Sequence, residues 1–82
     1  MSLEELRVAP RKTIGTKQTR KALEREEVCT LFLARDAEDH IIRPVADLGE
    51  RQGVEILYVE TMMKLGKACG IAVGAAVAAI LR

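Results

Sequence analysis

The sequence predicts an α/β fold in which helices cover both faces of a small sheet. Segments with helix start and stop signals alternate along the whole chain with short apolar runs rich in strand-forming residues. Alternation of this kind is typical of α/β sandwiches, whose strands lie between layers of helices. The length of 82 residues fits one domain over residues 1–82, and 49% hydrophobic residues suffice for a thin core.

The first helix and the first strand are predicted from local signals on either side of a proline. Residues 2–9 are expected to be helical, because Ser2 can cap the helix and Glu5 stands at the capping-box position. Pro10 ends this helix. The short segment RKTIG, residues 11–15, is interpreted as an edge strand.

A second helix and a buried strand follow in the chain. Gly15 allows a sharp turn, and Thr16 is expected to cap a helix that ends near Arg25. Residues 28–34 form a near-continuous apolar run, VCTLFLA, which predicts a strand buried on both faces. The polar residues 34–40 are interpreted as a turn.

A third helix is predicted over residues 43–52, because Pro44 suits the first turn of a helix and Gly53 is a good helix stop. The apolar residues of this helix that would face the core are Val45, Ala46 and Leu48.

The last third of the chain repeats the alternation. Residues 54–60 are expected to be a second interior strand, and Thr61 is expected to cap the helix that follows, MMKLGKAC. Gly70 ends that helix, and the last strand is expected near residues 76–81.

Cysteine usage and the chain start indicate an intracellular protein. Cys29 and Cys69 stand far apart in apolar surroundings, and are expected to be buried thiols without a metal site, with a disulfide or a reactive thiol as the alternative. The first ten residues lack the hydrophobic core of a signal peptide, so a cytoplasmic location is expected. The apolar stretch at residues 68–81 is too short to span a bilayer. Gly66, just before it, is interpreted as a close-packing position, and Gly74, within it, as a turn position.

The net charge of +1 conceals a separation of signs along the chain. Residues 11–25 contain six cations and one acid, whereas residues 26–60 contain three cations and nine acids. Residues 61–82 contain three cations and no acid. Separated charges of this kind indicate either a solvated charged face or a surface that attracts a polyanion.

Enzymatic chemistry finds little support in the sequence. His40 is the only histidine and Ser2 the only serine, and neither belongs to a recognisable catalytic arrangement. The segment GTKQTRK lacks the spacing and the second glycine of a phosphate-binding loop. No catalytic residue, cofactor, metal or small-molecule substrate is therefore expected.

The segment IGTKQTRKALER, residues 14–25, places cations at the amino end of a helix, where the helix dipole repels them. At about 100° per residue, one arc of this helix can pack on the sheet, and it contains Thr19, Ala22 and Leu23. The opposite arc contains Lys17, Gln18, Lys21 and Arg25. We call these four residues the basic stripe.

The basic stripe favours a binding role over a solvated surface, because Lys17 and Lys21 repel each other at i and i+4. Helix-start N–H groups and lysines suit a phosphate-rich ligand, and Gln18 supplies a donor and an acceptor for a base edge. Since the chain has only two aromatic residues, a folded RNA fits better than a single strand.

A second unusual segment is GIAVGA, residues 70–75. Ile71 and Val73 are large aliphatic residues in a glycine-flanked turn, where polar residues are usual. Either they tuck into the core, or they form an apolar lip beside the basic stripe that packs against a base or sugar.

These segments, in this order, resemble the ribosomal-protein family L-seven-Ae/L-thirty-e, and within it the small bacterial YbxF-type members. The likeness covers nearly the whole chain. It is carried by the segments I-G-T-K-Q-T-R-K-A-L-E at 14–24, L-A-R-D-A at 33–37 and K-L-G-K-A-C-G-I-A-V-G-A-A at 64–76.

The resemblance implies a three-layer α-β-α sandwich with a small mixed four-stranded sheet, and binding of kink-turn RNA. The helix after the Gly15-Thr16 dipeptide would enter the RNA major groove at the bend. Lys17, Gln18 and Lys21 would read the edges of tandem sheared G·A pairs, with Arg25 on the backbone. The loop that covers a flipped-out nucleotide would be Ile71, Ala72 and Val73.

Two departures from the family pattern bear on affinity and on the identity of the RNA. Archaeal and eukaryotic members have Asn-Glu where this chain has Lys17-Gln18, so recognition here should depend more on charge. Ala72 stands where glutamate is common, and Gly74 stands where archaeal members place proline.

The sequence thus predicts a non-enzymatic, monomeric protein whose partner is structured RNA containing a kink-turn, with the ribosome as a further partner and no membrane association. The alternative prediction is a small protein-interaction module of the same fold that has lost RNA binding and docks a partner through its aliphatic loop.

Overall fold

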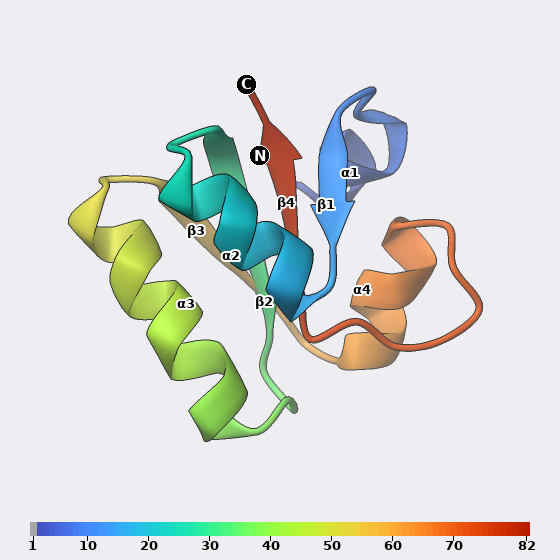
Figure 1. Cartoon of the computed structure of the whole chain (residues 1–82). Helices are drawn as coiled ribbons and strands as arrows, with labels where there is room; N and C mark the ends of the chain where they lie inside the picture. Colours follow the sequence, from blue (N-terminus) through green and yellow to red (C-terminus); the bar gives the residue numbers. More distant parts are fainter. Residues whose placement is uncertain (1) are drawn as a thin grey trace.

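The computed structural model describes residues 2–82, in which helices and strands alternate as the sequence predicts (Figure 1). The helices are α1 (Leu3–Val8), α2 (Thr16–Glu24), α3 (Asp39–Arg51) and α4 (Met62–Ala68). The strands are β1 (Lys12–Ile14), β2 (Val28–Ala34), β3 (Glu55–Val59) and β4 (Val77–Leu81). None of the helices in this part of the chain is both long and apolar enough to cross a bilayer.

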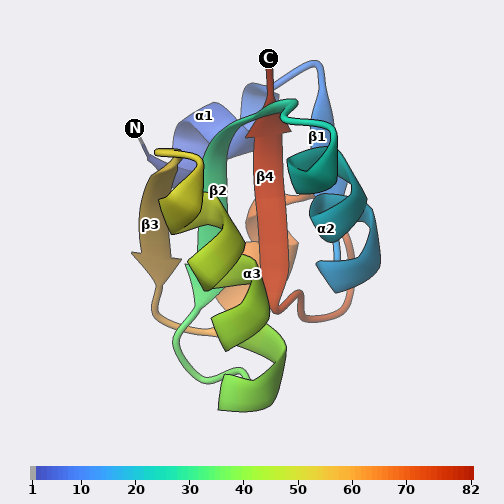
Figure 2. The same cartoon turned by 60° about the vertical axis from the view of Figure 1, so that its left-hand side comes forward.

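The strands form one mixed four-stranded sheet in the order β1-β4-β2-β3. The pair β2–β3 is parallel, whereas β4 runs antiparallel to both of its neighbours, β1 and β2 (Figure 2). β1 lies at an edge, as predicted. The prediction of a second interior strand at residues 54–60 is wrong, because β3 forms the other edge and pairs with β2 alone.

Two helices cover each face of the sheet, which confirms the three-layer α-β-α sandwich (Figures 1 and 2). On one face, Leu6 of α1 and Leu65 of α4 pack in a cluster with Phe32 of β2. On the other face, Leu23 of α2 and Val45 of α3 belong to a second cluster. Burying a large aliphatic side chain contributes roughly 1.5–3 kcal/mol, so both clusters hold the layers together.

The third helix begins four residues earlier than predicted. α3 begins at Asp39, with Glu38 in extended conformation as its N-cap, so Pro44 lies inside the helix. At this position proline removes one backbone hydrogen bond, to the carbonyl of His40. The exposed position of His40 leaves that carbonyl near water, which limits the cost.

Two smaller predictions are also corrected. The N-cap of α2 is Gly15 and Thr16 is the first helical residue, so the cap lies one position earlier than expected. Cys69 is buried as predicted, but Cys29 is exposed. Cys29 lies at an irregularity in the β2–β4 pairing, between Val28 and Thr30, which turns its side chain away from the core.

Other local signals are confirmed. The hydroxyl oxygen of Thr61 accepts a 3.1 Å hydrogen bond from the Lys64 N–H and caps α4. The expected helix stops at Gly53 and Gly70 follow α3 and α4, and both have positive φ.

Candidate nucleic-acid interface

The start of α2 is held at the point where β1 meets β4. Gly15 adopts φ = 97°, a conformation that residues with a Cβ rarely adopt, and this lets the chain turn from β1 into the helix. Its N–H donates a 2.8 Å hydrogen bond to the carbonyl of Val77. The hydroxyls of Thr13 and Thr19 lie 2.9 Å apart and join β1 to α2. These contacts fix the direction in which the helix leaves the sheet.

The two arcs of α2 are separated as the periodicity predicts. Thr19, Ala22 and Leu23 are buried, and the whole basic stripe is exposed. Within residues 2–82, no ion pair involves Lys17, Lys21 or Arg25. The structure therefore brings together uncompensated cations and the amide of Gln18 on one side of a single helix.

Backbone donors lie at the same end of the helix. The first intrahelical bond runs from the N–H of Thr19 to the carbonyl of Gly15, at 3.1 Å. The N–H groups of Thr16, Lys17 and Gln18 precede this bond and have no partner within the helix. Such groups, with the positive end of the helix dipole, can bind phosphate oxygens.

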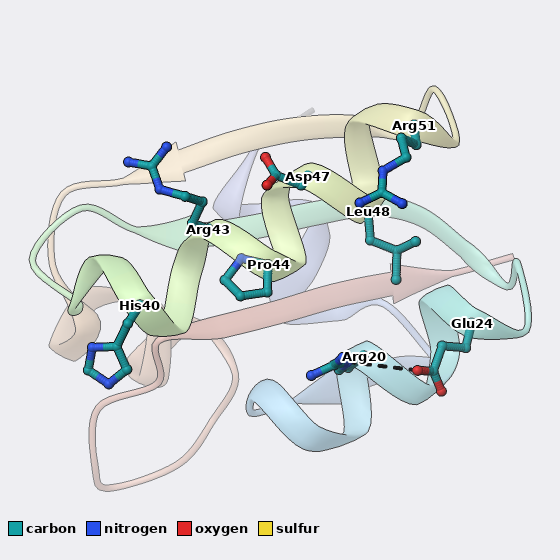
Figure 3. Close-up of a pocket in the computed structure, with 8 residues that line it drawn as sticks. All are labelled: Arg20, Glu24, His40, Arg43, Pro44, Asp47, Leu48 and Arg51. Carbon is teal, nitrogen blue, oxygen red and sulfur yellow. Dashed lines mark ion pairs between the residues drawn. The ribbon is translucent and has the colours of Figure 1, made fainter.

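Arg20 lies on a different side of α2 from the basic stripe. It lines a groove between α2 and α3, where its guanidinium is 3.7 Å from the carboxylate of Glu24 (Figure 3). Across the groove, Asp47 of α3 adds a second carboxylate beside Arg43 and Arg51. The groove therefore mixes arginines with carboxylates, and Arg20, paired with Glu24, is not one of the unpaired cations of the basic stripe.

We call residues 70–76, between α4 and β4, the α4–β4 loop. Its two large aliphatic residues differ in burial. Ile71 is half-buried and packs against the core cluster beneath α1 and α4. Ala72 is exposed, and Val73 is 66% exposed. The sequence left two interpretations open for these residues. Ile71 packs in the core, as one of them expects, and Val73 is exposed at the surface, as the other expects.

The α4–β4 loop and the start of α2 are neighbours. The loop leads directly into Val77, whose carbonyl accepts the hydrogen bond from Gly15. In both views of the molecule the loop returns to β4 past the first turn of α2 (Figures 1 and 2). The structure thus places the first turn of α2, with Gly15 and Thr16, beside the end of the loop that leads into β4.

Two residues that the sequence did not single out line a shallow groove beside this loop. Met63 and Lys67 lie on α4 next to Ile71 and Ala72. Met63 is 63% exposed, which is unusual for a large apolar side chain. Their i, i+4 spacing beside a glycine-rich loop is the signal that could have revealed them.

Two observations concern metal binding and thiol chemistry in the described residues. Among residues 2–82, no three histidine, cysteine, aspartate or glutamate side chains lie close enough together to hold a metal ion. Burial raises the pKa of the Cys69 thiol, which keeps this sulfur in its protonated, poorly nucleophilic form.

Comparison with known proteins identifies a family. The model of the ribosomal protein L7Ae/L30e/S12e/Gadd45 family matches residues 2–82. An RNA-binding protein of Halalkalibacterium halodurans is 49% identical over 80 residues, covering 98% of both chains. RNA-binding protein YbxF of Geobacillus stearothermophilus is 45% identical over 82 residues, covering 100% of both.

Two more distant proteins are also similar to this chain. Large ribosomal subunit protein eL8 of Halobacterium salinarum is 38% identical over 68 residues, which is 82% of this chain and 57% of that protein. The solved structure of the 15.5kD RNA binding protein of Giardia lamblia matches with a TM-score of 0.86 at 22% identity, covering 98% of this chain and 68% of that chain. This structural match supports the fold.

The family match also supports the prediction that the protein is not an enzyme. It confirms the resemblance seen in the sequence, including the likeness to YbxF. The chain belongs to the ribosomal protein L7Ae/L30e/S12e/Gadd45 family.

Proposed function

We propose that this chain is an RNA-binding protein that recognises kink-turn RNA, with its tandem G·A pairs at a sharp bend. The observation that carries the proposal is the exposed basic stripe along the nine-residue helix α2, whose cations form no ion pair within residues 2–82. Relatives 45–49% identical over nearly the whole chain are named RNA-binding proteins, which supports the same class of ligand.

Each residue of the basic stripe has a separate role in this proposal. Lys17 and Lys21 neutralise phosphates at the bend and reach the G·A edges. The N–H groups of Thr16, Lys17 and Gln18 lie at the helix end that approaches the backbone, and Gly15 sets the direction of that end through its bond to Val77. Gln18 bonds to a base edge, because its amide both donates and accepts. Arg25, at the far end of α2, contacts the RNA backbone.

The α4–β4 loop supplies the apolar part of the interface. Val73 packs against a base or sugar that the kink leaves unstacked, since its side chain is 66% exposed. Ile71 anchors the loop in the core, and Ala72 leaves the approach open. An apolar contact of this kind adds shape selectivity to the sequence-independent attraction of the lysines.

The proposal extends to the cellular context. The protein acts as a monomeric, cytoplasmic RNA-binding domain over residues 1–82 and meets its kink-turn in ribosomal RNA or another structured RNA. Similarity to large ribosomal subunit protein eL8 over 68 residues supports the association with ribosomes.

A mobility-shift titration tests the proposal. The chain is titrated against a kink-turn duplex and against the same duplex with its G·A pairs replaced by Watson–Crick pairs. We expect tight binding only to the intact kink-turn. Equal affinity for both duplexes would refute structure-specific recognition. Absence of binding to either would favour the protein-interaction module, for which the exposed Val73 and Met63 provide an apolar surface.

A further inference from the structure

Gly66 on α4 lies directly beneath the backbone of the α4–β4 loop. A Cβ atom at Gly66 would overlap the carbonyl oxygen of Val73, and would lie 3.0 Å from its carbonyl carbon and 3.1 Å from the Cα of Gly74. All three of these loop atoms are backbone atoms, which cannot rotate away as a flexible side chain can. The loop therefore takes its observed path only because residue 66 has no side chain.

Two hydrogen bonds hold the loop along the same stretch of α4. The N–H of Ile71 donates to the carbonyl of Gly66 at 3.1 Å, and the N–H of Ala75 donates to the carbonyl of Met62 at 3.0 Å. Met62 and Gly66 are one turn apart on α4, so the two bonds lie on one side of the helix. Val73 lies midway in the sequence between the two donors, and its backbone carbonyl is in close contact with α4.

This arrangement decides which aliphatic side chain reaches solvent. The carbonyl of Val73 faces Gly66, and its side chain is 66% exposed. Ile71, at the end of the loop nearer α4, is half-buried against the core. If the loop were displaced from α4, the Val73 side chain would lie at a different position on the surface.

We infer that Gly66 is the positioning residue of the RNA-binding surface: the close approach it permits sets the backbone of Val73 against α4 and orients the Val73 side chain toward the ligand. This inference rests on the proposed function, because the ligand is the kink-turn RNA. Gly66 itself is buried and acts only through the loop. Its contribution is preorganisation, which lowers the cost of ordering the loop on binding.

Substitution of Gly66 by alanine tests the inference. Restoring ordinary van der Waals separation requires the loop backbone to move by on the order of 1 Å. Gly49 provides a matched control in α3, because a Cβ there would meet Cδ2 of Leu31 at 2.9 Å, a side-chain contact on the opposite face of the sheet. Both variants add one methyl group to a crowded helical glycine, and only Gly66→Ala moves the loop.

The binding experiment is a double-mutant cycle with the kink-turn duplex. We expect Gly66→Ala to weaken binding about tenfold, while folded Gly49→Ala binds as the unsubstituted protein does. In a Val73→Ala background, Gly66→Ala should have little further effect, because the side chain it misplaces is already gone. Independent, additive losses would overturn the inference and indicate a general structural role.

A readout without RNA separates this inference from the proposed function. Amide hydrogen exchange should show faster exchange at Ile71 and Ala75 in Gly66→Ala, with the Gly15 amide unchanged. Unchanged protection at Ile71 and Ala75 would overturn the inference even where the RNA binds. Failure of the unsubstituted protein to bind any kink-turn would instead refute the proposed function.

A second variant covers the case in which Gly66→Ala does not fold. A Cβ at Gly74 would lie 3.1 Å from the Cβ of Met62, a tight contact made from the loop side. We expect Gly74→Ala to fold and to weaken kink-turn binding by a smaller factor that again disappears in the Val73→Ala background. Additivity of Gly74→Ala with Val73→Ala would count against the inference in the same way.

Discussion

The backbone N–H of Gly15 donates a 2.8 Å hydrogen bond to the carbonyl of Val77, although the two residues are far apart in the sequence. Gly15 lies between β1 and α2, and Val77 follows the α4–β4 loop as the first residue of β4. This bond joins the two segments that carry the proposed RNA-binding residues.

Substitution of Gly15 by alanine should destabilise the protein through backbone strain alone. A Cβ at Gly15 would have no heavy atom within 4 Å, so no steric clash contributes, but φ = 97° is unfavourable for alanine. We expect a loss of roughly 1–3 kcal/mol in the free energy of unfolding. Urea denaturation measures this loss, and a stability equal to that of the unsubstituted protein would contradict the observed turn.

Lys21→Ala should weaken binding of kink-turn RNA and reduce its dependence on salt. Lys21 is exposed and has no ion pair within the described residues, so each RNA contact it makes releases counterions. We expect the log–log salt slope to fall by about one unit. The measurement is affinity at several salt concentrations.

Arg20→Ala is the control for Lys21→Ala, because it removes the same charge from the neighbouring position of α2. Arg20 lies on the side facing α3 and is paired with Glu24 at 3.7 Å. We expect its loss to leave the salt slope nearly unchanged. Equal effects of the two variants would show that only net charge matters.

Gln18→Ala should reduce discrimination more than affinity. The Gln18 side chain carries no charge, so its loss should change binding to the G·A-disrupted duplex little. Binding to the intact kink-turn should fall by roughly 1–3 kcal/mol, the range for a good base contact. Parallel titrations of both duplexes measure the ratio, and an unchanged ratio would exclude Gln18 from base recognition.

Glu26→Gly should stabilise the protein. Glu26 follows α2 with φ = 57°, a left-handed conformation that disfavours residues other than glycine. Its N–H bonds to the carbonyl of Leu23 at 2.9 Å, and the next N–H, of Glu27, bonds to the carbonyl of Ala22 at 3.0 Å, so this conformation ends the helix. Glycine at this position should add roughly 0.5–1 kcal/mol.

Glu26→Ala separates backbone strain from charge at this position. Alanine removes the carboxylate but keeps the cost of the left-handed conformation, so thermal unfolding should show no comparable gain. A gain of the same size in both variants would attribute the effect to the charge instead.

The stability of the protein should fall at alkaline pH in part because of Cys69. Burial raises the pKa of its thiol above the ordinary value of 9.0. Above the unfolded pKa, the unfolded chain loses this proton while the folded chain retains it, so unfolding becomes more favourable as pH rises. Below the unfolded pKa the thiol is protonated in both states and has no such effect.

Cys69→Ala tests this pH dependence. The variant should show a shallower decline of the free energy of unfolding above about pH 9 than the unsubstituted protein. Because both proteins carry the same lysines and tyrosine, the difference between their curves isolates the thiol. Parallel curves would show that Cys69 does not contribute.

Much of the fold could be predicted because its signals are local. Burial of Leu23 and exposure of Lys21 follow from the helical period of α2, and capping of α4 by Thr61 follows from residue chemistry. The start of α3 was missed because a proline in the second turn of a helix, here Pro44, gives the same local signal as one in the first turn.

The sequence by itself determined the alternation of helices and strands, the two arcs of α2 and the family. Tertiary structure alone decided the place of β3 at the sheet edge, the exposure of Cys29, and the burial of Ile71 in the core while Val73 is exposed. The physical reason is that periodicity and capping depend on near neighbours. The exposure of Val73 instead depends on its packing against Gly66 of α4, which only the folded chain brings into contact.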